Sequence, residues 1–464
     1  MKKIDRVISD ATKLCHPGIS TTDKLKSVSG KVMEKIEQAI SYLAHDKIIG
    51  LYLGGSYAKG TWLPEDMDLD FFVKFDPSIS KLDFEDLGVK VGLLALRHYN
   101  PYLRYSEHPY VEAHIDDIRI NIVPCYDVKQ GNWISAADRS PFHTTFMREK
   151  LSDDMRCQVR ILKLFLKSIG IYGAQISVAG FSGYITEILI LKYGSFLRVI
   201  ESIASLNREK YVISINNSVG HSVDGIMSKI VVMDPVDDKR NLGAAISANS
   251  LGKFILAARS FLENPRVEYF KKLAMNLDVK IISQLRPNLL VVEFHIRKRS
   301  PDILWGQLNR SLRALVRQLD LSGFNAISST CTSDETKYAA FIFLIEFTRL
   351  PAFSLRIGPE ILRRQETEHF FLNKNSVPFW IDRNMKVLTI SKRKTTDVKE
   401  YVTEILSSNA SGVGLNKDIA ADLKLGYDVY GGAERELSGS IVSALGKLMI
   451  NDKRFINSQR EGRY

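Results

Sequence analysis

Apolar positions in the first third of the chain recur with two periods, one helical and one extended. Between residues 23 and 48 they return every three or four positions, which predicts a helix, and the apolar run over 48–53 predicts a strand directly after it. A second helix is expected over 84–97. Alternating patterns over 110–115 and 118–123 flank an Asp-Asp pair that suits a two-residue hairpin turn. Together these elements predict a mixed sheet with helices on one side.

Farther along, the pattern changes to helices and then to a second mixed region. Residues from about 150 to 210 and from 241 to 262 have helical periodicity, with a short strand at 230–233 between them. The next segment predicts the order strand, helix, strand and strand, over 289–295, 303–319, 324–330 and 338–347. This β-α-β-β order suits a small ferredoxin-like platform.

The patterns predict a multidomain chain of the α+β class, and a length of 464 residues also favours more than one domain. A sheet-containing catalytic region comes first, a helical region second, the β-α-β-β platform third, and a charged mixed region last. The expected boundaries are 1–140, 141–262, 263–360 and 361–464.

The segment 54–75 carries the most specific chemistry. It joins a small-residue turn to two aspartates that stand i, i+2 on an apolar strand, the first of them twelve positions after Ser56. Side chains alternate along a strand, so Asp68 and Asp70 share one face while the residues between them enter the core. Adjacent carboxylates repel each other unless a cation neutralises them, and a few carboxylates together with substrate phosphates suit Mg²⁺. The segment resembles the polymerase-β-type nucleotidyltransferases.

Charge and cysteine usage narrow the setting of this site. The formal net charge is +11 and the pI is about 9.2, which favours a polyanionic partner such as a nucleic acid. The four cysteines lie far apart without a disulfide or zinc pattern, which is typical of a reducing, intracellular compartment. No stretch approaches the ~20 apolar residues that a bilayer requires, so we expect a cytoplasmic protein without a membrane segment.

Seven short strings, in order along the chain, resemble one family within that superfamily, the archaeal (class I) CCA-adding enzymes, which are tRNA nucleotidyltransferases. The strings are GSYAKGTWL at 55–63, VPCY at 123–126, DRSPFH at 138–143, GIYGA at 170–174, GFSGY at 180–184, DPVDDKRN at 234–241 and IGP at 357–359.

The resemblance implies a polymerase-β-like nucleotidyltransferase head, a helical neck that selects the nucleotide, a ferredoxin-like α/β body and an α/β tail. It implies template-independent addition of C, C and A to the 3′ end of tRNA from CTP and ATP, with Mg²⁺ as cofactor. Body and tail would hold the acceptor stem and TΨC arm by shape and backbone, a mode that suits A-form RNA. A homodimer is left open.

The resemblance also assigns roles to residues of this sequence. Gly55, Ser56 and Lys59 would contact the triphosphate, and Asp68 and Asp70 would bind Mg²⁺. The expected lining of the nucleotide pocket comprises Ser140, His143, Lys163, Tyr172 and Arg240. The arginine would read the base edge, because a planar fork of donors suits the acceptor atoms of C and A.

One position departs from the family pattern. The third carboxylate of the catalytic and metal set stands two residues before VPCY, and here that position is Asn121. Asparagine is nearly isosteric with aspartate but neutral, so nucleotide and one metal should still bind while the hydroxyl-activating ion loses an anionic ligand. A two-residue turn would place Glu112 opposite Asn121, about 5 Å away on the same face. An inactivating Asp-to-Asn change is favoured over substitution by Glu112.

The sequence leaves two alternatives to CCA addition open. The first is another polymerase-β-like transferase, such as a poly(A)-adding or oligoadenylate-forming enzyme, which would extend RNA with ATP alone. The second, motivated by Asn121 and the basic charge, is a tRNA-binding homologue without catalysis.

Overall fold

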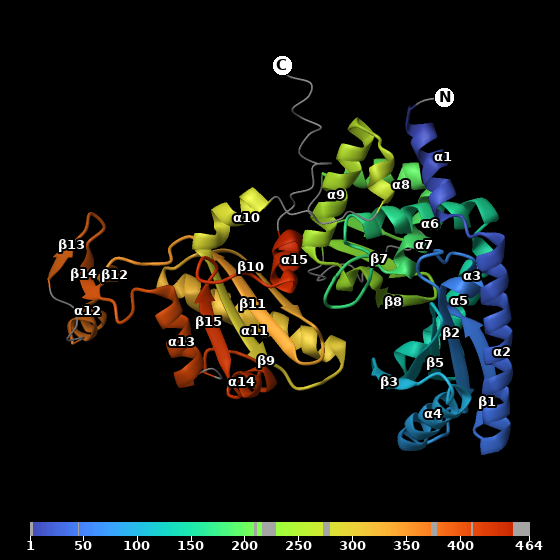
Figure 1. Cartoon of the computed structure of the whole chain (residues 1–464). Helices are drawn as coiled ribbons and strands as arrows, with labels where there is room; N and C mark the ends of the chain where they lie inside the picture. The colour runs from blue at the N-terminus through green and yellow to red at the C-terminus, as the bar shows by residue number, and fades with distance from the viewer. Residues whose placement is uncertain are drawn as a thin grey trace. The chain divides into compact units, whose positions relative to one another are not determined.

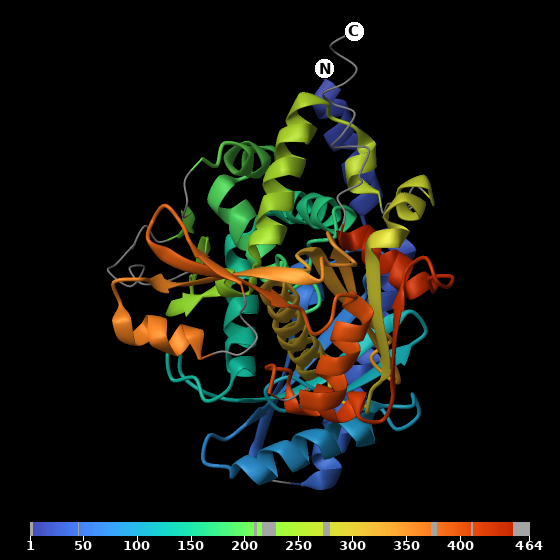
Figure 2. The same cartoon turned by 90° about the vertical axis from the view of Figure 1, so that its left-hand side faces the viewer.

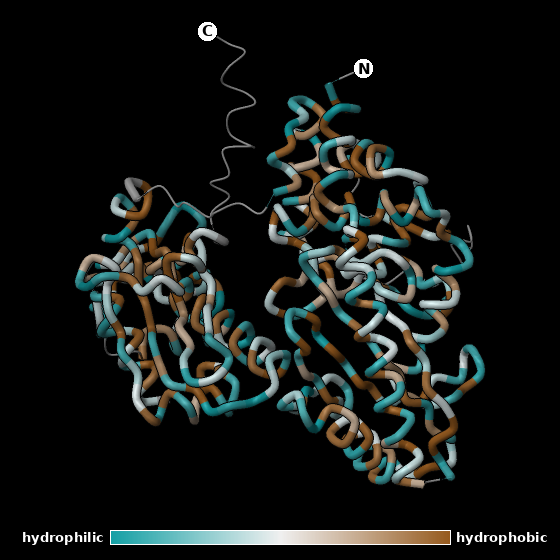
Figure 3. Tube along the Cα trace, turned by 45° about the vertical axis from the view of Figure 1, so that its right-hand side comes forward, coloured by the Kyte–Doolittle hydropathy of each residue, from teal (hydrophilic) through white to brown (hydrophobic). Residues whose placement is uncertain are grey.

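A computed structural model describes residues 3–44, 46–207, 211–215, 229–271, 279–372, 378–409 and 412–448 (Figure 1). It forms two compact units, one of Met1–Ala274 with Asp452–Tyr464 and one of Met275–Asn451. Residues 449–464 of the predicted tail region lie outside the described part of the chain. Hydrophobic stretches run along the strands and helices within each unit (Figure 3).

The first unit contains a five-stranded mixed sheet of order β1-β2-β5-β4-β3. Only β2 and β5 pair in parallel, and the other neighbours are antiparallel. The strands are β1 (Ile48–Gly54), β2 (Asp68–Phe75), β3 (Tyr102–Tyr105), β4 (Pro109–Ile115) and β5 (Ile118–Tyr126). Ile115 pairs with Ile118, so the predicted two-residue hairpin turn is confirmed.

Helices α2 (Ile19–Leu43) and α4 (Lys81–Ala95) cover one face of this sheet. Apolar side chains of both helices form one core with Phe71, Val73 and Phe75 of β2. The opposite face of β2 therefore carries Asp68 and Asp70, as the alternation predicts. Helices on one side of a mixed sheet are confirmed.

A helical layer follows the sheet along the chain. Its helices are α5 (Arg139–Lys150), α6 (Asp153–Ser168), α7 (Gly183–Tyr193), α8 (Phe196–Ala204) and α9 (Ala248–Glu263). Helix α1 (Lys3–Cys15) packs into the same core through Val7, Ala11 and Cys15. The first helix of the predicted catalytic region 1–140 thus belongs to the helical core, because its apolar positions four apart face α6 rather than the sheet.

The helix expected over 241–262 begins later than predicted. Strands β7 (Ile230–Asp234) and β8 (Asp237–Asn241) form a hairpin, and β6 (Tyr211–Ile213) pairs with β7. Helix α9 then starts after its N-cap Ser247, whose hydroxyl accepts the amide hydrogen of Ser250 at 3.1 Å.

The second unit is built on a four-stranded antiparallel sheet of order β10-β11-β9-β15. Its elements are β9 (Leu289–His295), α11 (Pro301–Ser322), β10 (Ala326–Ser333), β11 (Tyr338–Ile345) and β15 (Tyr427–Gly431). The predicted β-α-β-β order is present. Strand β15, which comes after the boundary expected at residue 360, joins the same sheet beside β9.

Helices cover both faces of that sheet. Helices α11, α13 (Val398–Asn409) and α14 (Lys417–Leu423) share a core with Leu290 and Val292 of β9. Helix α15 (Gly439–Leu448) packs with Leu289 and Val291, which alternate to the other face. Helix α10 (Val279–Leu285) precedes the sheet.

A small excursion separates β11 from α13. Strands β12 (Phe353–Glu360), β13 (Phe379–Ile381) and β14 (Lys386–Lys392) form a sheet of order β12-β14-β13. Helix α12 (Arg364–Phe371) lies beside β12 (Figures 1 and 2). Among the described residues, no helix combines the length and apolar character that crossing a bilayer requires.

Candidate active site

The two aspartates of the motif lie at the start of β2, beside two donors of the parallel strand β5. Asp68 is in register with Arg119, and Asp70 is in register with Asn121. The Arg119 guanidinium donates to Asp68 Oδ2 at 2.5 Å, and the Asn121 amide Nδ2 donates to Asp70 Oδ1 at 2.9 Å. Burial raises the pKa of Asp68, and the positive charge of Arg119 opposes this rise. We call Asp68, Asp70, Arg119 and Asn121 the acidic strand site.

The small-residue turn lies directly against this site. Gly55 has φ of +69° and opens the short helix α3 (Gly55–Lys59). A Cβ atom at Gly55 would come within 1.9 Å of Asp70 Oδ2, so only glycine fits both the conformation and the space. Ser56 follows in the first turn of α3. The structure thus brings the predicted residue Gly55 to the acidic strand site, with Ser56 next to it in the chain.

Glu112 lies opposite Asn121, as the hairpin register predicts. Its side chain is 5% exposed, accepts a hydrogen bond from the Tyr102 hydroxyl, and pairs with Arg104 through a 3.4 Å contact between Oε2 and Nε. The carboxylate of Glu112 is therefore already neutralised by partners on β3, the strand farther from Asp70.

Lys59, at the end of α3, points into a buried joint with the helical layer. Its ammonium lies 2.7 Å from Glu187 Oε2 on α7, and the Thr61 hydroxyl donates to the other oxygen of Glu187 at 2.6 Å. Lys163 of α6 donates to the Thr61 carbonyl oxygen at 2.8 Å. We call Lys59, Thr61, Lys163 and Glu187 the buried joint. The triphosphate contact predicted for Lys59 stays a prediction, and its ammonium already has a partner.

Tyr172 lies close to Lys163 of the buried joint. A Cβ atom at Gly183 would be 2.9 Å from the Tyr172 hydroxyl and 3.6 Å from Lys163 Nζ. Burial lowers the pKa of Lys163 to about 8, an effect that Glu187 opposes, and burial raises the pKa of Tyr172. Of these two predicted pocket residues, Lys163 is buried and Tyr172 is half-buried.

Two of the remaining predicted residues, His143 and Arg240, lie against Asp234, at the end of β7. His143 Nε2 lies 2.8 Å from Asp234 Oδ2, and Arg240 Nη1 lies 3.7 Å from the same oxygen. Tyr184 donates to the other oxygen at 3.4 Å and stacks on His143 with centroids 3.9 Å apart. Burial lowers the pKa of His143, although Asp234 opposes the change. Ser140 lies one turn before His143, where its carbonyl oxygen accepts from Thr144 at 2.9 Å.

Helix α3 connects the two groups. Its first residue, Gly55, contacts Asp70, and the ammonium of its last residue, Lys59, lies 5.6 Å from the ring centroid of Tyr184. Tyr184 in turn stacks on His143. Acidic, basic and aromatic groups thus follow one another along α3, from Asp70 through Lys59 to Tyr184 and His143.

Known families match successive parts of the chain. Their descriptions are nucleotidyltransferase domain over residues 33–143, tRNA nucleotidyltransferase second domain over 157–271, and CCA-adding enzyme C-terminal domain over 287–432. The CCA-adding enzyme of Pyrobaculum aerophilum is 34% identical over 421 residues, which cover 90% of this chain and 97% of that one. The chain belongs to the CCA-adding enzyme family.

Other relatives agree with that assignment. The CCA-adding enzyme of Pyrobaculum islandicum is 33% identical and covers 90% of this chain and 97% of its own. That of Methanocaldococcus jannaschii is 29% identical, with coverages of 89% and 93%. The resemblance drawn from the sequence is confirmed, as is the expected multidomain chain of mixed α and β structure with a nucleotidyltransferase head. The alternative of a poly(A)-adding enzyme is not favoured.

The sequence alone assigned no role to three residues that contact the predicted site residues in this CCA-adding family member. Glu187 stands in the apolar string ITEILIL, where a buried carboxylate requires a cationic partner, so its isolation was a usable signal. Asp234 is the first residue of the string DPVDDKRN, in which a role was predicted only for Arg240. Arg119 lies two residues before Asn121 on β5 and so shares its face of the sheet. The local sequence pattern does not indicate that Arg119 pairs with Asp68.

The donor set of the acidic strand site fits one hard cation. Asp68 and Asp70 supply carboxylate oxygens. The side-chain amide oxygen Oδ1 of Asn121 is buried without a hydrogen-bond partner. Within the described part of the chain, no three His, Cys, Asp or Glu side chains form a group that could hold a metal. A third carboxylate is thus absent from this set.

Proposed function

We propose that this chain adds C, C and A, without a template, to the 3′ end of tRNA, using CTP and ATP and releasing pyrophosphate. The observation that carries the proposal is the likeness to CCA-adding enzymes over 90% of the chain. A cytoplasmic location accords with these substrates. A homodimer stays a prediction.

The nucleotide would bind along the path from the acidic strand site to Asp234. Asp68 and Asp70 would hold Mg²⁺, which when bound activates the 3′-hydroxyl and neutralises the leaving pyrophosphate. The side chain of Arg240 is 39% exposed and meets Asp234 through Nη1, so its other N–H groups suit the acceptor atoms of a base. Asp234 orients both Arg240 and His143.

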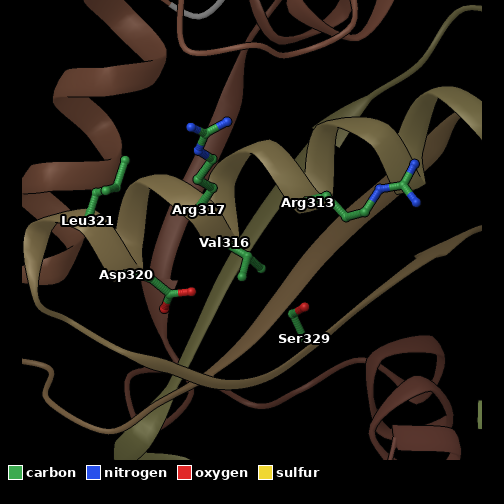
Figure 4. A pocket seen from close by; sticks show the side chains of 6 residues that line it. All are labelled: Arg313, Val316, Arg317, Asp320, Leu321 and Ser329. Atoms are coloured by element: carbon green, nitrogen blue, oxygen red, sulfur yellow. The ribbon is translucent and has the colours of Figure 1, made fainter.

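For the tRNA, we propose a backbone contact on the second unit. Arg310, Arg313 and Arg317 follow one exposed face of α11 at intervals of three and four residues. Arg313 and Arg317 line a cavity of about 460 Å³ together with Ser329 of β10 (Figure 4). Exposed guanidinium groups beside a hydroxyl suit the phosphates of an RNA stem. Contacts to the acceptor stem and TΨC arm accord with this surface.

Incubation with tRNA that lacks its CCA end, Mg²⁺ and labelled CTP or ATP tests the proposal, with Asn121→Asp as the paired variant. We expect incorporation of both nucleotides, faster by on the order of 100-fold in Asn121→Asp, because an anionic ligand returns to the site.

Other outcomes separate the alternatives. Extension of any RNA by ATP alone would indicate a poly(A)-adding activity. Tight, salt-sensitive tRNA binding without incorporation by either form would indicate a binding protein. Equal rates in both forms would contradict the role given to Asn121.

A further inference from the structure

The acidic strand site contains its own cation. Asp68 accepts a hydrogen bond from Arg119, and the pair is partly exposed, at 22% and 42% of the two side chains. Asp70 accepts from the neutral amide of Asn121. The four side chains together therefore carry one net negative charge.

The nearby carboxylate does not restore the missing charge. Glu112 is in register with Asn121, but Arg104 and Tyr102 already neutralise it from the β3 side. Bringing Glu112 to a metal would leave the Arg104 charge without its partner. Two divalent ions side by side would then face one net negative charge, which does not balance them.

We infer that Arg119 is the resident counter-cation of Asp68 and that the acidic strand site binds a single divalent ion, in competition with this guanidinium. Besides Asp68, the ligands for that ion are the carboxylate of Asp70 and the side-chain amide oxygen Oδ1 of Asn121, which has no hydrogen-bond partner. Arg119 acts as a positioning residue, since it controls the charge and orientation of Asp68. The inference rests on the proposed function for the identity of the site.

A titration of the full-length chain with Mn²⁺ alone, followed by the electron paramagnetic resonance signal of the free ion, tests this. We expect one Mn²⁺ per chain. Arg119→Gln should bind it about tenfold more tightly, because the competing positive charge is removed. Arg119→Lys, which keeps the charge, should stay close to the unaltered chain. Asn121→Asp should bind a second Mn²⁺.

Lys74→Gln is the matched control, since Lys74 carries the same charge as Arg119, lies on β2 with Asp68 and Asp70, and pairs with Asp127 instead of an aspartate of the site. Thermal unfolding verifies that each variant folds. The inference is overturned if the unaltered chain binds two Mn²⁺ ions with similar affinity, or if Arg119→Gln and Lys74→Gln have equal affinities. Mn²⁺ binding requires no tRNA, so failure of CCA addition alone would reject the proposed function and leave this result standing.

Discussion

The acidic strand site and the buried joint use the same kinds of side chain in opposite surroundings. Both draw on residues 54–75, and both pair carboxylates with cations. At the strand site the Asp68 and Arg119 side chains are 22% and 42% exposed, whereas in the joint Glu187 and Lys59 are 0% and 9% exposed. Exposed charges are available to ligands, and buried charges must first satisfy each other. Burial, rather than residue type, separates a binding site from a structural joint.

Lys59 and Lys163, which were predicted to bind the nucleotide, belong to the buried joint. The resemblance assigned Lys59 and Lys163 to the nucleotide, yet both ammonium groups are hydrogen-bonded inside the protein, to Glu187 and to the Thr61 carbonyl oxygen. Through these bonds α3 of the head is fixed to α6 and α7 of the helical layer. Since α3 also contacts Asp70, the joint holds α3 against the acidic strand site.

Among the substitutions considered, Glu187→Gln is expected to lower the stability of the fold the most. This change leaves the buried ammonium of Lys59 without a counter-charge, which should lower the free energy of unfolding by about 3–5 kcal/mol. Urea unfolding followed by circular dichroism measures it. Glu201→Gln, at an exposed position of α8, is the control and should change little.

A paired replacement sharpens the same test. In Lys59→Met/Glu187→Leu both charges disappear together, and most of the stability should return. If Glu187→Gln costs no more than Glu201→Gln, the joint does not stabilise the fold and the contrast with the strand site fails.

A second prediction concerns pH. Burial lowers the pKa of Lys163 to about 8, below the ordinary value of the unfolded chain, about 10.4. Between these values the unfolded chain holds a proton that the folded chain has released, so stability rises with pH across this window. Relative to Lys163→Met, the free energy of unfolding of the unaltered chain should rise by about 2–3 kcal/mol between about pH 7.5 and 10. Urea unfolding at a series of pH values measures this rise.

The control for this pH effect is Lys150→Met, at an exposed position near the end of α5. Its pH profile shows what the loss of a surface lysine does to stability, and the effect of Lys163 is measured against it. Parallel pH profiles for Lys163→Met and the unaltered chain would mean that Lys163 stays charged in the joint.

Local periodicity explains which parts of the site were predictable. Alternation along β2 places Asp68 and Asp70 on one face, and the two-residue turn sets Glu112 opposite Asn121. These relations depend on neighbours in one strand or hairpin. The bond from Lys59 to Glu187 joins residues 128 positions apart, and it depends on how α7 packs against α3. A single sequence provides no register for that contact.

The same reasoning applies to the fold. Strands β9 to β11 were predictable because each has several alternating or apolar positions bounded by turns. Strand β15 has five residues and lies far along the chain from its partner β9, so its place in the sheet could not be inferred. Helix α1 was missed as part of the helical core because its apolar positions fit packing on either layer.

The smallest effect is expected from Arg119→Gln on stability. A partly exposed ion pair is worth about 0–1 kcal/mol, because water screens it and ordering two side chains costs entropy. Raising the salt from about 0.1 M to about 1 M shortens the Debye length from ~10 Å to ~3 Å, so even this small loss should shrink. Urea unfolding at both salt concentrations measures it, with Lys74→Gln as the control. A loss as large as that of Glu187→Gln would mean that the acidic strand site supports the fold as the joint does, and the guanidinium would then not be free to yield Asp68 to a metal ion.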